Sequence, residues 1–507
     1  ARRAVFSGLR RIKPLLPTGR HISALDESDP RVTKMPDPVL ARSAEAPIVL
    51  TDEMLRRLDK PGPRYTSYPT ADRFVEAFGA EQYGQALRQR AQGAVVGGAP
   101  PLSLYVHIPF CESLCYYCAC NKVITKHHER ARPYLDDLRV EVALHVAELG
   151  HGQPVSQLHL GGGTPTFLTD GELDELMAML RAAFQFAPDA ELGIEVDPRT
   201  ASRERLHHLR SLGFNRISFG VQDFDANVQK AVHRVQPFEM VRELMGQARA
   251  LGFQSINADL IYGLPRQTPE SFARTIAQVV ELRPDRIALY AYAHLPQRFK
   301  PQRRIIGAEL PEPEQRVRML QGALAGFLSH GYVYIGMDHF AKPDDELSVA
   351  QRQGRLHRNF QGYSTHAECD MMSFGISSIS MVGPSYCQNV KTLDEYYDRL
   401  DNGVLPVYRG IELTPDDLLR RSIIQALMCH FEVSIEGLEV AHLIDFKRYF
   451  ADEIADLREM EKGGLLKLDD KWISVQPRGR MLVRAIAMVF DRYLRADRER
   501  ARYSKVI

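Results

Sequence analysis

Leu104-Tyr-Val-His-Ile-Pro-Phe-Cys111-Glu-Ser-Leu-Cys115-Tyr-Tyr-Cys118-Ala-Cys120 joins a short apolar run to a dense group of thiols. Four of the seven cysteines in the chain lie within its last ten residues. Thiolates on one tight loop can converge on a common metal or cluster once they lose their protons. Iron-sulfur ligation is one use of such a loop.

Three explanations of this loop compete. A structural zinc site usually draws its four ligands from two separated pairs, and no distant pair is evident here. Electron-transfer ferredoxins use four cysteines at other spacings. The third explanation is three thiolates, Cys111-x3-Cys115-x2-Cys118, on a four-iron cluster whose fourth iron stays open. An open position lets a substrate or cosubstrate bind the metal directly.

The amino-acid composition limits the classes of protein to which the chain can belong. At 507 residues, the chain is long enough for two or three domains of roughly 150 residues each. Lys+Arg 65 against Asp+Glu 64 leaves a net charge of +1, which argues against a general nucleic-acid or anionic-membrane binder. No apolar run approaches the roughly 18 residues of a membrane span. The odd number of cysteines, most of them clustered, indicates a reduced, intracellular protein rather than a disulfide framework.

The amino-terminal part divides into two segments. Residues 1–50 are predicted to be a disordered basic extension, because six Arg and Lys residues precede the first acid, Asp26. An organelle transit peptide or an expression artefact are the alternatives. Residues 51–102 are predicted to be an N-terminal wrapping segment, with Pro61-Gly-Pro-Arg-Tyr-Thr-Ser-Tyr-Pro-Thr70 as an ordered wrapping loop. A plain linker would have similar composition.

Strand and helix patterns then alternate, which favours a parallel sheet or a (β/α) barrel over residues 103–345. Helix starts are marked by capping signals at Thr169 and Thr268, and helix ends by Gly213, Gly252 and Gly331. The predicted strands are Leu104-Ile108, Val155-Leu160, Glu191-Val196, Arg216-Val221, Ser255-Ile261, Arg286-Tyr292 and Val333-Met337.

This rhythm ends near Asp344. Residues 346–412 are predicted to be a connecting region, and residues 413–507 a mainly helical domain. That domain would begin with a helix over Leu418-Phe431, contain a hairpin turning at Asp469-Asp470, and close with a helix over Arg478-Leu494. A hairpin among helices has winged-helix character, but the neutral charge favours a packing or lid domain over DNA binding.

The three-cysteine spacing, placed directly after a strand, resembles the signature of radical S-adenosylmethionine (SAM) enzymes. The resemblance implies that the amino and carboxylate groups of SAM occupy the open iron. One electron from the cluster then cleaves SAM, and the resulting 5'-deoxyadenosyl radical abstracts hydrogen from the substrate. The implied fold is α/β, a radical-SAM partial (β/α)6 barrel with an N-terminal wrapping segment and a mainly helical C-terminal domain.

Further motifs narrow the resemblance to the oxygen-independent coproporphyrinogen III oxidases, from Thr51 to about Leu494. A haem-chaperone-like paralogue shares the cysteine motif and remains the alternative, although it usually has Phe at the position of Cys120 and lacks the Pro-Arg-Tyr-Thr-Ser-Tyr-Pro segment. The motifs are the 61–70 loop, Cys118-Ala-Cys120-Asn-Lys, Gly161-Gly-Gly-Thr-Pro-Thr166, Glu195-Val-Asp-Pro198, Phe219-Gly-Val-Gln-Asp-Phe224, Asp259-Leu-Ile-Tyr-Gly-Leu-Pro265, Gly336-Met-Asp-His-Phe340 and His357-Arg-Asn-Phe-Gln-Gly-Tyr363.

The family's reaction converts two propionates of coproporphyrinogen III to vinyl groups, giving protoporphyrinogen IX in haem biosynthesis. A radical suits this chemistry, because the β-hydrogen of a propionate is too weakly acidic for a protein base. The resemblance implies a 4Fe-4S cluster held by Cys111, Cys115 and Cys118, and two SAM molecules. The first SAM would contact Tyr105, Gly162, Glu195, Ala293 and Ile379; the second, Tyr117, Gly163, Thr164, Gln222, Arg234 and Asp259.

Considered singly, these residues have plainer explanations. The Gly161-Gly163 run fits a tight strand-to-loop turn, Glu195 and Asp259 fit helix caps or arginine partners, and Arg234 fits a surface charge. Tyr117 replaces the Phe common in relatives. The role of Cys120 stays unassigned.

Substrate contacts are predicted from chemistry alone. Four propionates need cationic or amide partners, and Arg binds carboxylates in a bidentate manner. The candidates are Arg64, Arg352 and Arg358, each with a solvated surface position as its alternative. His339 would either relay a proton or fill the barrel mouth.

The resemblance also implies a flavodoxin- or ferredoxin-like electron donor, a monomer, and no nucleic-acid or membrane partner. The expected location is cytoplasmic, or an organelle if the basic extension is a transit peptide. A cluster-bearing electron carrier without SAM is a further alternative function.

Overall fold

The computed structural model describes residues 62–97 and 100–496, so the predictions for residues 1–50 lie outside the described residues. A twelve-stranded sheet dominates it, in the order β16-β15-β14-β13-β1-β4-β5-β6-β7-β8-β10-β9. Six consecutive neighbours in this order pair in parallel, which confirms the predicted partial (β/α)6 barrel. They are β1 (Leu102–Ile108), β4 (Gln153–Gly162), β5 (Phe184–Val196), β6 (Arg216–Gln222), β7 (Ser255–Tyr262) and β8 (Arg286–Ala291).

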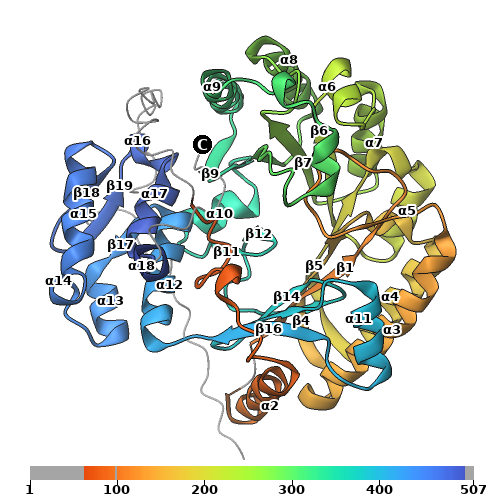
Figure 1. The fold of residues 1–507 in the computed structure, drawn as a ribbon, viewed down its shortest axis with the longest axis horizontal. Helices are drawn as coiled ribbons and strands as arrows, with labels where there is room; N and C mark the ends of the chain where they lie inside the picture. Colours follow the sequence, from red (N-terminus) through yellow and green to blue (C-terminus); the bar gives the residue numbers. More distant parts are fainter. Residues whose placement is uncertain (1–61, 98–99, 497–507) are drawn as a thin grey trace, which may run out of the picture. The chain divides into compact units, whose positions relative to one another are not determined.

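Helices follow these strands and lie on their outer side (Figure 1). Thr169 forms the predicted capping box, and Thr268 caps α8 with Pro269 at the start of the helix as predicted. Gly213, Gly252 and Gly331 end helices with φ of 98°, 80° and 82°. The helices are α3 (Ala131–Leu149), α4 (Asp170–Ala183), α5 (Arg203–Ser211), α6 (Ala226–Ala231), α7 (Phe238–Ala250), α8 (Pro269–Leu282) and α9 (Pro313–Ser329). None of the described helices combines the length and apolarity that a membrane span requires.

Both ends of the sheet are extended by strands that break the parallel pattern. The predicted strand Val333-Met337 is observed as β9 (Val333–Gly336), but it pairs antiparallel with β10 (His339–Ala341). On the other side, β13 (Asp370–Phe374) lies parallel to β1, and β14 (Ile379–Val382), β15 (Ser385–Asn389) and β16 (Val407–Glu412) continue antiparallel.

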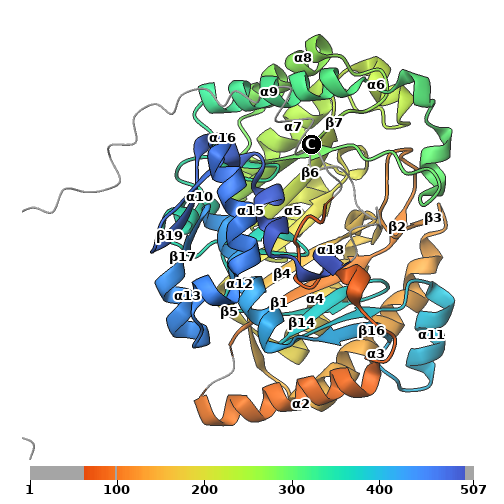
Figure 2. The same cartoon turned by 60° about the vertical axis from the view of Figure 1, so that its left-hand side comes forward.

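The structure therefore corrects the description of residues 346–412 as a connecting region. Besides these strands, the region contains α10 (Glu346–Arg352), a hairpin of β11 (His357–Asn359) and β12 (Gly362–Ser364), and α11 (Leu393–Asp401). All five residues of β15 are buried although three of them are polar, Ser385, Gln388 and Asn389, so no apolar pattern marked the strand. Figure 2 shows α2 (Ala80–Gly97) beside this end of the sheet, where it contacts β14, β15 and β16.

The carboxyl-terminal part is mainly helical. The predicted first helix and hairpin are confirmed as α12 (Pro415–His430) and as β18 (Leu466–Leu468) with β19 (Trp472–Val475). The single helix predicted over Arg478-Leu494 is wrong: it is divided into α16 (Pro477–Arg480), α17 (Val483–Ala487) and α18 (Arg492–Ala496). Its residues are buried on several sides, so packing overrides helical continuity. The other elements are β17 (Glu432–Ser434), α13 (Ile435–His442), α14 (Phe446–Tyr449) and α15 (Ala451–Lys462).

The segment of residues 62–70 packs against this carboxyl-terminal part. Tyr65 donates a hydrogen bond to Asp491 at 3.0 Å, and Arg484 donates to the carbonyl of Gly62 at 2.6 Å. Tyr65 and Tyr68 are each only 1% exposed. Residues 62–70 are therefore held against the carboxyl-terminal part, while the wrapping segment of residues 51–102 and the domain limits at residues 102, 345 and 412 remain predictions.

Candidate active site

The cysteine loop leaves the carboxyl end of β1. Its first cysteine, Cys111, ends β2 (Phe110–Cys111), which pairs in parallel with β3 (Val123–Ile124) on the far side of the loop. The amide of Cys118 donates to the carbonyl of Cys115 at 3.2 Å and forms a turn between the two. None of these cysteines is in a disulfide. The short stretch from β2 to β3 therefore presents four free thiols, among them the three of the Cys111-x3-Cys115-x2-Cys118 motif.

The glycine run at the end of β4 lies against this loop. Gly162 has φ of 110°, and a Cβ atom on Gly163 would lie 2.6 Å from the carbonyl oxygen of Pro109. Only glycine permits so close an approach. Next to it, Thr164 donates to the sulfur of Cys111 at 3.3 Å. Burial raises the pKa of the Cys111 thiol to about 11 and the Thr164 bond partly offsets this, so a bound metal would have to displace the proton.

Cationic groups surround Cys115. Arg199 and Arg234 each place a guanidinium nitrogen 3.5 Å from its sulfur, and both pair with Asp197, at 2.6 and 3.0 Å. Burial alone would lower the pKa of Arg234, but Tyr117 and the Asp197 carboxylate raise it, which keeps the guanidinium charged. Such positive charge stabilises thiolates and an anionic cluster.

The third thiol is activated by its own neighbours. A hydrogen bond from Cys120 lowers the pKa of Cys118 to about 6; burial opposes this shift and the ammonium of Lys122 adds to it. Lys122 also donates to the carbonyls of Cys118 and Cys120, each at 3.2 Å. Cys120 therefore lowers the pKa of Cys118 from a position two residues further along the same loop. The three-thiol loop, its cationic surroundings and the glycine approach fit a cluster ligated by Cys111, Cys115 and Cys118.

A first group of predicted SAM residues gathers around Glu195, near the end of β5. The carboxylate accepts from the amide of Gly162 at 3.3 Å and lies 3.4 Å from His159. Burial raises its pKa, but the contacts with His159 and Gly162 outweigh this, and the net pKa is lowered. The ring of Tyr105 stacks on His159 with centroids 6.1 Å apart. An ionised acceptor therefore stands beside an aromatic face.

A second carboxylate, Asp259 on β7, accepts hydrogen bonds from Ser218 at 2.8 Å and Asn257 at 2.9 Å. Burial raises its pKa to about 6, while the bond from Ser218 opposes the shift. Gln222 ends β6 in the left-handed region with φ of 64°, a conformation that a side chain adopts only at a cost. Gln222 stands at the carboxyl end of its strand, where a barrel enzyme places its chemistry, and Asp259 lies in the carboxyl-terminal half of β7.

The side chain of Gln302 joins two more of the predicted residues. Its amide donates to the backbone carbonyls of Tyr117 at 3.1 Å and Ala293 at 3.2 Å. Gln302 is 1% exposed and lies in the 3-10 helix Lys300–Arg304. Through these two hydrogen bonds, Gln302 links the cysteine loop to the segment that follows β8. Ile379 begins β14, and its carbonyl accepts from Ser373, the residue that pairs with Tyr105.

Nine of the eleven predicted SAM residues are partly exposed, whereas Thr164 and Arg234 are buried. Sequence reasoning missed several residues that contact the predicted cluster and SAM residues and fix their positions. Asp197 and Arg199 stood inside or next to a quoted motif without a role, and nothing in the sequence marked Gln302. The others missed are His107, His159, Ser218 and Asn257.

Two of the three arginine candidates form one cluster. Arg358 donates from Nε to the carbonyl of Arg64 at 3.2 Å, and Arg64 pairs with Asp338. The guanidinium of Arg64 lies over the ring of Tyr290 at 5.5 Å, and that of Arg358 over Tyr363 at 4.7 Å. Tyr290 and Tyr363 line a cavity of about 160 Å³ that Glu195 and Asp259 also line.

Charge in this cluster is not balanced. Arg358 is 2% exposed and its buried Nη1 has no hydrogen-bond partner among the described residues. Burial and the charge of Arg358 lower the pKa of Arg64 to about 10. Burial and both arginines also hold the pKa of His339 well below its usual range, so His339 is neutral. The third candidate, Arg352, is exposed at the end of α10, donates to the carbonyl of Pro343 at 2.9 Å, and does not join the cluster.

A three-cysteine loop at the carboxyl ends of six parallel strands, followed by a glycine run and strand-end carboxylates, defines a radical SAM enzyme. The family model described as Radical SAM superfamily matches residues 105–279, and the model described as HemN C-terminal domain matches residues 413–482. The enzyme uses a 4Fe-4S cluster and SAM, as members of this superfamily do.

Comparison with known relatives identifies a family within the radical SAM enzymes. It is 51% identical to the oxygen-independent coproporphyrinogen III oxidase of Pseudomonas aeruginosa, over 90% of this chain and 98% of the relative. It is 49% identical to the Escherichia coli enzyme of the same name over similar shares, 90% and 98%. The solved structure of coproporphyrinogen III oxidase from Escherichia coli, described as a radical SAM enzyme, superposes with a TM-score of 0.83 at 48% identity, covering 89% of this chain and all of that one. The chain belongs to the oxygen-independent coproporphyrinogen III oxidase family.

Proposed function

We propose that this protein converts two propionate side chains of coproporphyrinogen III to vinyl groups without oxygen, giving protoporphyrinogen IX in haem biosynthesis. The observation that carries the proposal is the identity of 51% over 98% of a relative with this named activity. The intact cysteine loop and the unbalanced arginine cluster support it, since the reaction needs a radical source and anchors for carboxylates.

The residues would divide the work as follows. Cys111, Cys115 and Cys118 hold the cluster, and Glu195 and Asp259 offer carboxylates to amino and hydroxyl groups of two SAM molecules. When bound, the cluster and SAM supply a one-electron route for removing hydrogen from an unactivated carbon. The other SAM contacts proposed are Tyr105, Tyr117, Gly162, Gly163, Thr164, Gln222, Arg234, Ala293 and Ile379.

Arg64 and Arg358 would anchor substrate propionates. The buried Nη1 of Arg358 lacks a partner among the described residues, and the carboxylate of Asp338 pairs with Arg64. A propionate would supply the missing negative charge and acceptor oxygens. Because a radical removes the hydrogen atom, no residue has to act as a base at the β-carbon, and loss of carbon dioxide completes the vinyl group once an acceptor takes the remaining electron.

We also propose a flavodoxin- or ferredoxin-like electron donor, a monomeric enzyme and a cytoplasmic location. These rest on the family resemblance.

The test is anaerobic turnover after cluster reconstitution, with SAM, coproporphyrinogen III, a reductant and an electron acceptor. The protein should form 5'-deoxyadenosine and vinyl-bearing porphyrinogens. Cys115→Ser should abolish both products and the cluster absorption, whereas Cys387→Ser, which changes a buried thiol on β15, should leave them intact. Tight haem binding without any porphyrinogen turnover would contradict the oxidase and favour a haem chaperone.

A further inference from the structure

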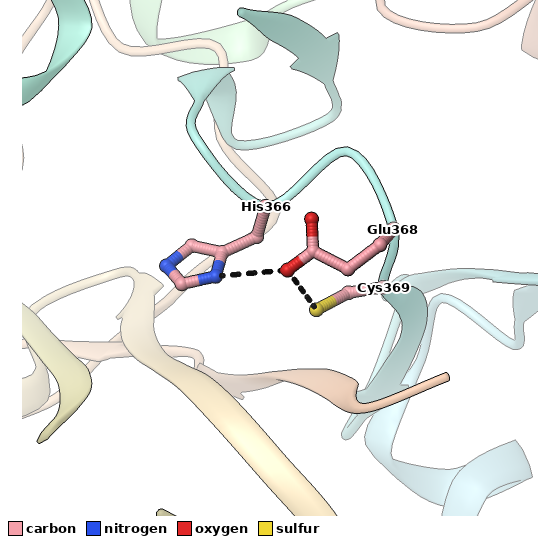
Figure 3. A group of neighbouring side chains, drawn as sticks. All are labelled: His366, Glu368 and Cys369. Carbon is pink, nitrogen blue, oxygen red and sulfur yellow. Dashed lines mark hydrogen bonds and ion pairs between the residues drawn. The ribbon is translucent and has the colours of Figure 1, made fainter. Parts of the chain in front are cut away.

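A group of three potential metal ligands lies outside the active site. His366, Glu368 and Cys369 occupy the turn between β12 and β13, and their ligand atoms all lie within 4.8 Å of one another. Figure 3 shows the three side chains converging, with one carboxylate oxygen facing both the imidazole and the thiol. The amide of Cys369 donates to the carbonyl of His366 at 3.3 Å, so the turn itself brings the first and last of the three residues together.

The spacing of these atoms leaves room for a cation between them, with the thiol of Cys369 donating a long hydrogen bond to Glu368 in its absence. Oε1 of Glu368 lies 3.7 Å from Nδ1 of His366 and 3.8 Å from the sulfur of Cys369. An N–H···O hydrogen bond is normally about 2.7–3.2 Å long, so the imidazole contact is too long for a good one. A tetrahedral zinc with bonds of about 2.0–2.3 Å separates neighbouring ligand atoms by about 3.3–3.8 Å.

A second and independent feature concerns the other imidazole nitrogen. Nε2 of His366 faces the carboxylate of Glu191 at 3.7 Å, and that carboxylate is fixed by Arg216 at 2.7 Å and by Gln157 at 2.9 Å. Histidines that bind metals commonly donate their second N–H to a carboxylate, which orients the ring and selects the nitrogen that faces the metal. At 3.7 Å the Nε2 contact is longer than a direct hydrogen bond, so the carboxylate of Glu191 provides negative charge opposite Nε2 and leaves Nδ1 to face Glu368 and Cys369.

The group is also accessible from one side. Cys369 is 5% exposed, whereas the side chains of His366 and Glu368 are 19% and 55% exposed. A cation could enter past Glu368 and keep a water molecule as its fourth ligand.

This place is distinct from the cluster site. The next residue, Asp370, begins β13 and pairs with Leu102 at the start of β1, whereas the cysteine loop follows the end of β1. Seven residues of extended strand separate the two ends by about 20 Å.

We propose that His366, Glu368 and Cys369 bind one thiophilic divalent cation of the zinc class, with the fourth position open to water. Mixed sulfur, nitrogen and oxygen ligands select zinc over magnesium or calcium, which prefer oxygen alone. Binding exchanges the thiol proton for the metal, and the proton passes to solvent. The bound cation would stabilise the conformation of the turn that leads into β13.

The experiment uses the full-length enzyme with its cluster reconstituted. The protein is dialysed anaerobically against zinc buffered by a competing chelator, and zinc and iron are measured per chain. The wild type should retain one zinc beyond the cluster iron. Cys369→Ser, His366→Ala and Glu368→Gln should each weaken zinc retention by about tenfold or more. Cys387→Ser is the matched control and should retain zinc like the wild type.

Iron content should be unchanged in all four variants, which excludes zinc bound at an emptied cluster loop. Zinc X-ray absorption should report one sulfur neighbour that disappears in Cys369→Ser. Absence of zinc from the wild type would overturn the proposal, as would equal retention by the three ligand variants or a zinc spectrum without sulfur. Glu368 is exposed, so Glu368→Gln still tests the proposal if a buried replacement fails to fold.

Discussion

Replacing Arg358 by Gln tests the proposed propionate anchor. Gln keeps a donor that can reach the carbonyl of Arg64, which Arg358 now contacts at 3.2 Å, but it removes the positive charge. The substrate would lose one charge-assisted hydrogen-bonding partner, worth about 1.5–3 kcal/mol. At about 1.4 kcal/mol per factor of ten, KM for coproporphyrinogen III should rise about 10- to 150-fold.

The free energy of unfolding should change less than the free energy of substrate binding. The contact of the guanidinium with the ring of Tyr363, at 4.7 Å, contributes about 0.5–2 kcal/mol, and its loss is partly offset because Arg64 no longer faces a like charge. A urea unfolding curve measures the change in the free energy of unfolding separately from KM. With kcat little changed, the effect would lie in substrate binding.

The assay is anaerobic turnover over a range of substrate concentrations, with chromatographic separation of the vinyl porphyrins after oxidation. Arg352→Gln is the matched control, because Arg352 is exposed and lies apart from the cluster; its KM should equal that of the wild type. An unchanged KM in Arg358→Gln, or an equal rise in Arg352→Gln, would refute the anchor.

Three further variants follow from the structure. Arg199→Gln removes one of two cationic donors near the sulfur of Cys115, and by about 1.4 kcal/mol per 59 mV the cluster's reduction potential should become more negative by tens of millivolts in a redox titration. Gln302→Leu leaves two partly buried carbonyls without this donor, at a cost of about 1–3 kcal/mol, and should weaken SAM binding in equilibrium dialysis while far-ultraviolet circular dichroism stays unchanged. Glu141 is fully buried and its pKa is raised from 4.5 to about 7 by burial, against the bonds from Tyr396, Gly375 and Asn389. Its folded pKa exceeds the unfolded one, so its stabilisation is complete below about pH 4.5 and about 3 kcal/mol is lost as pH rises through about 7. Relative to Glu141→Gln, wild-type stability in urea should fall over this range, and parallel curves would contradict the assignment.

Periodicity and capping signals were enough to predict the barrel. Its strands are largely apolar runs, most of whose residues are buried, and the helices between them start and stop at residues with local signals such as Thr169 and Gly213. The hairpin after Leu465 was equally local. These features depend on neighbours in sequence, which pattern reasoning can detect.

The rest depends on partners far along the chain. Strands β13 to β16 are short and partly polar, and they are buried because β1 and α2 cover them. Within the candidate site, the cysteine motif marked the proposed ligands, but the pairing of Asp197 and Arg199 with Arg234 emerges only when two separate segments meet. The separation of Arg352 from Arg64 and Arg358 is likewise a property of the folded chain.

The anchoring of residues 62–70 by the carboxyl-terminal helices has a consequence for biosynthesis. Tyr65 is bonded to Asp491, 426 positions later, and the same short segment carries Arg64 to the cavity rim. A ribosome releases Arg64 early, yet its proposed propionate-binding position is completed only when the last helices emerge. A nascent chain with a finished barrel and cysteine loop would still lack its full substrate site, so premature termination near the end should leave a protein that holds a cluster but cannot retain its porphyrinogen.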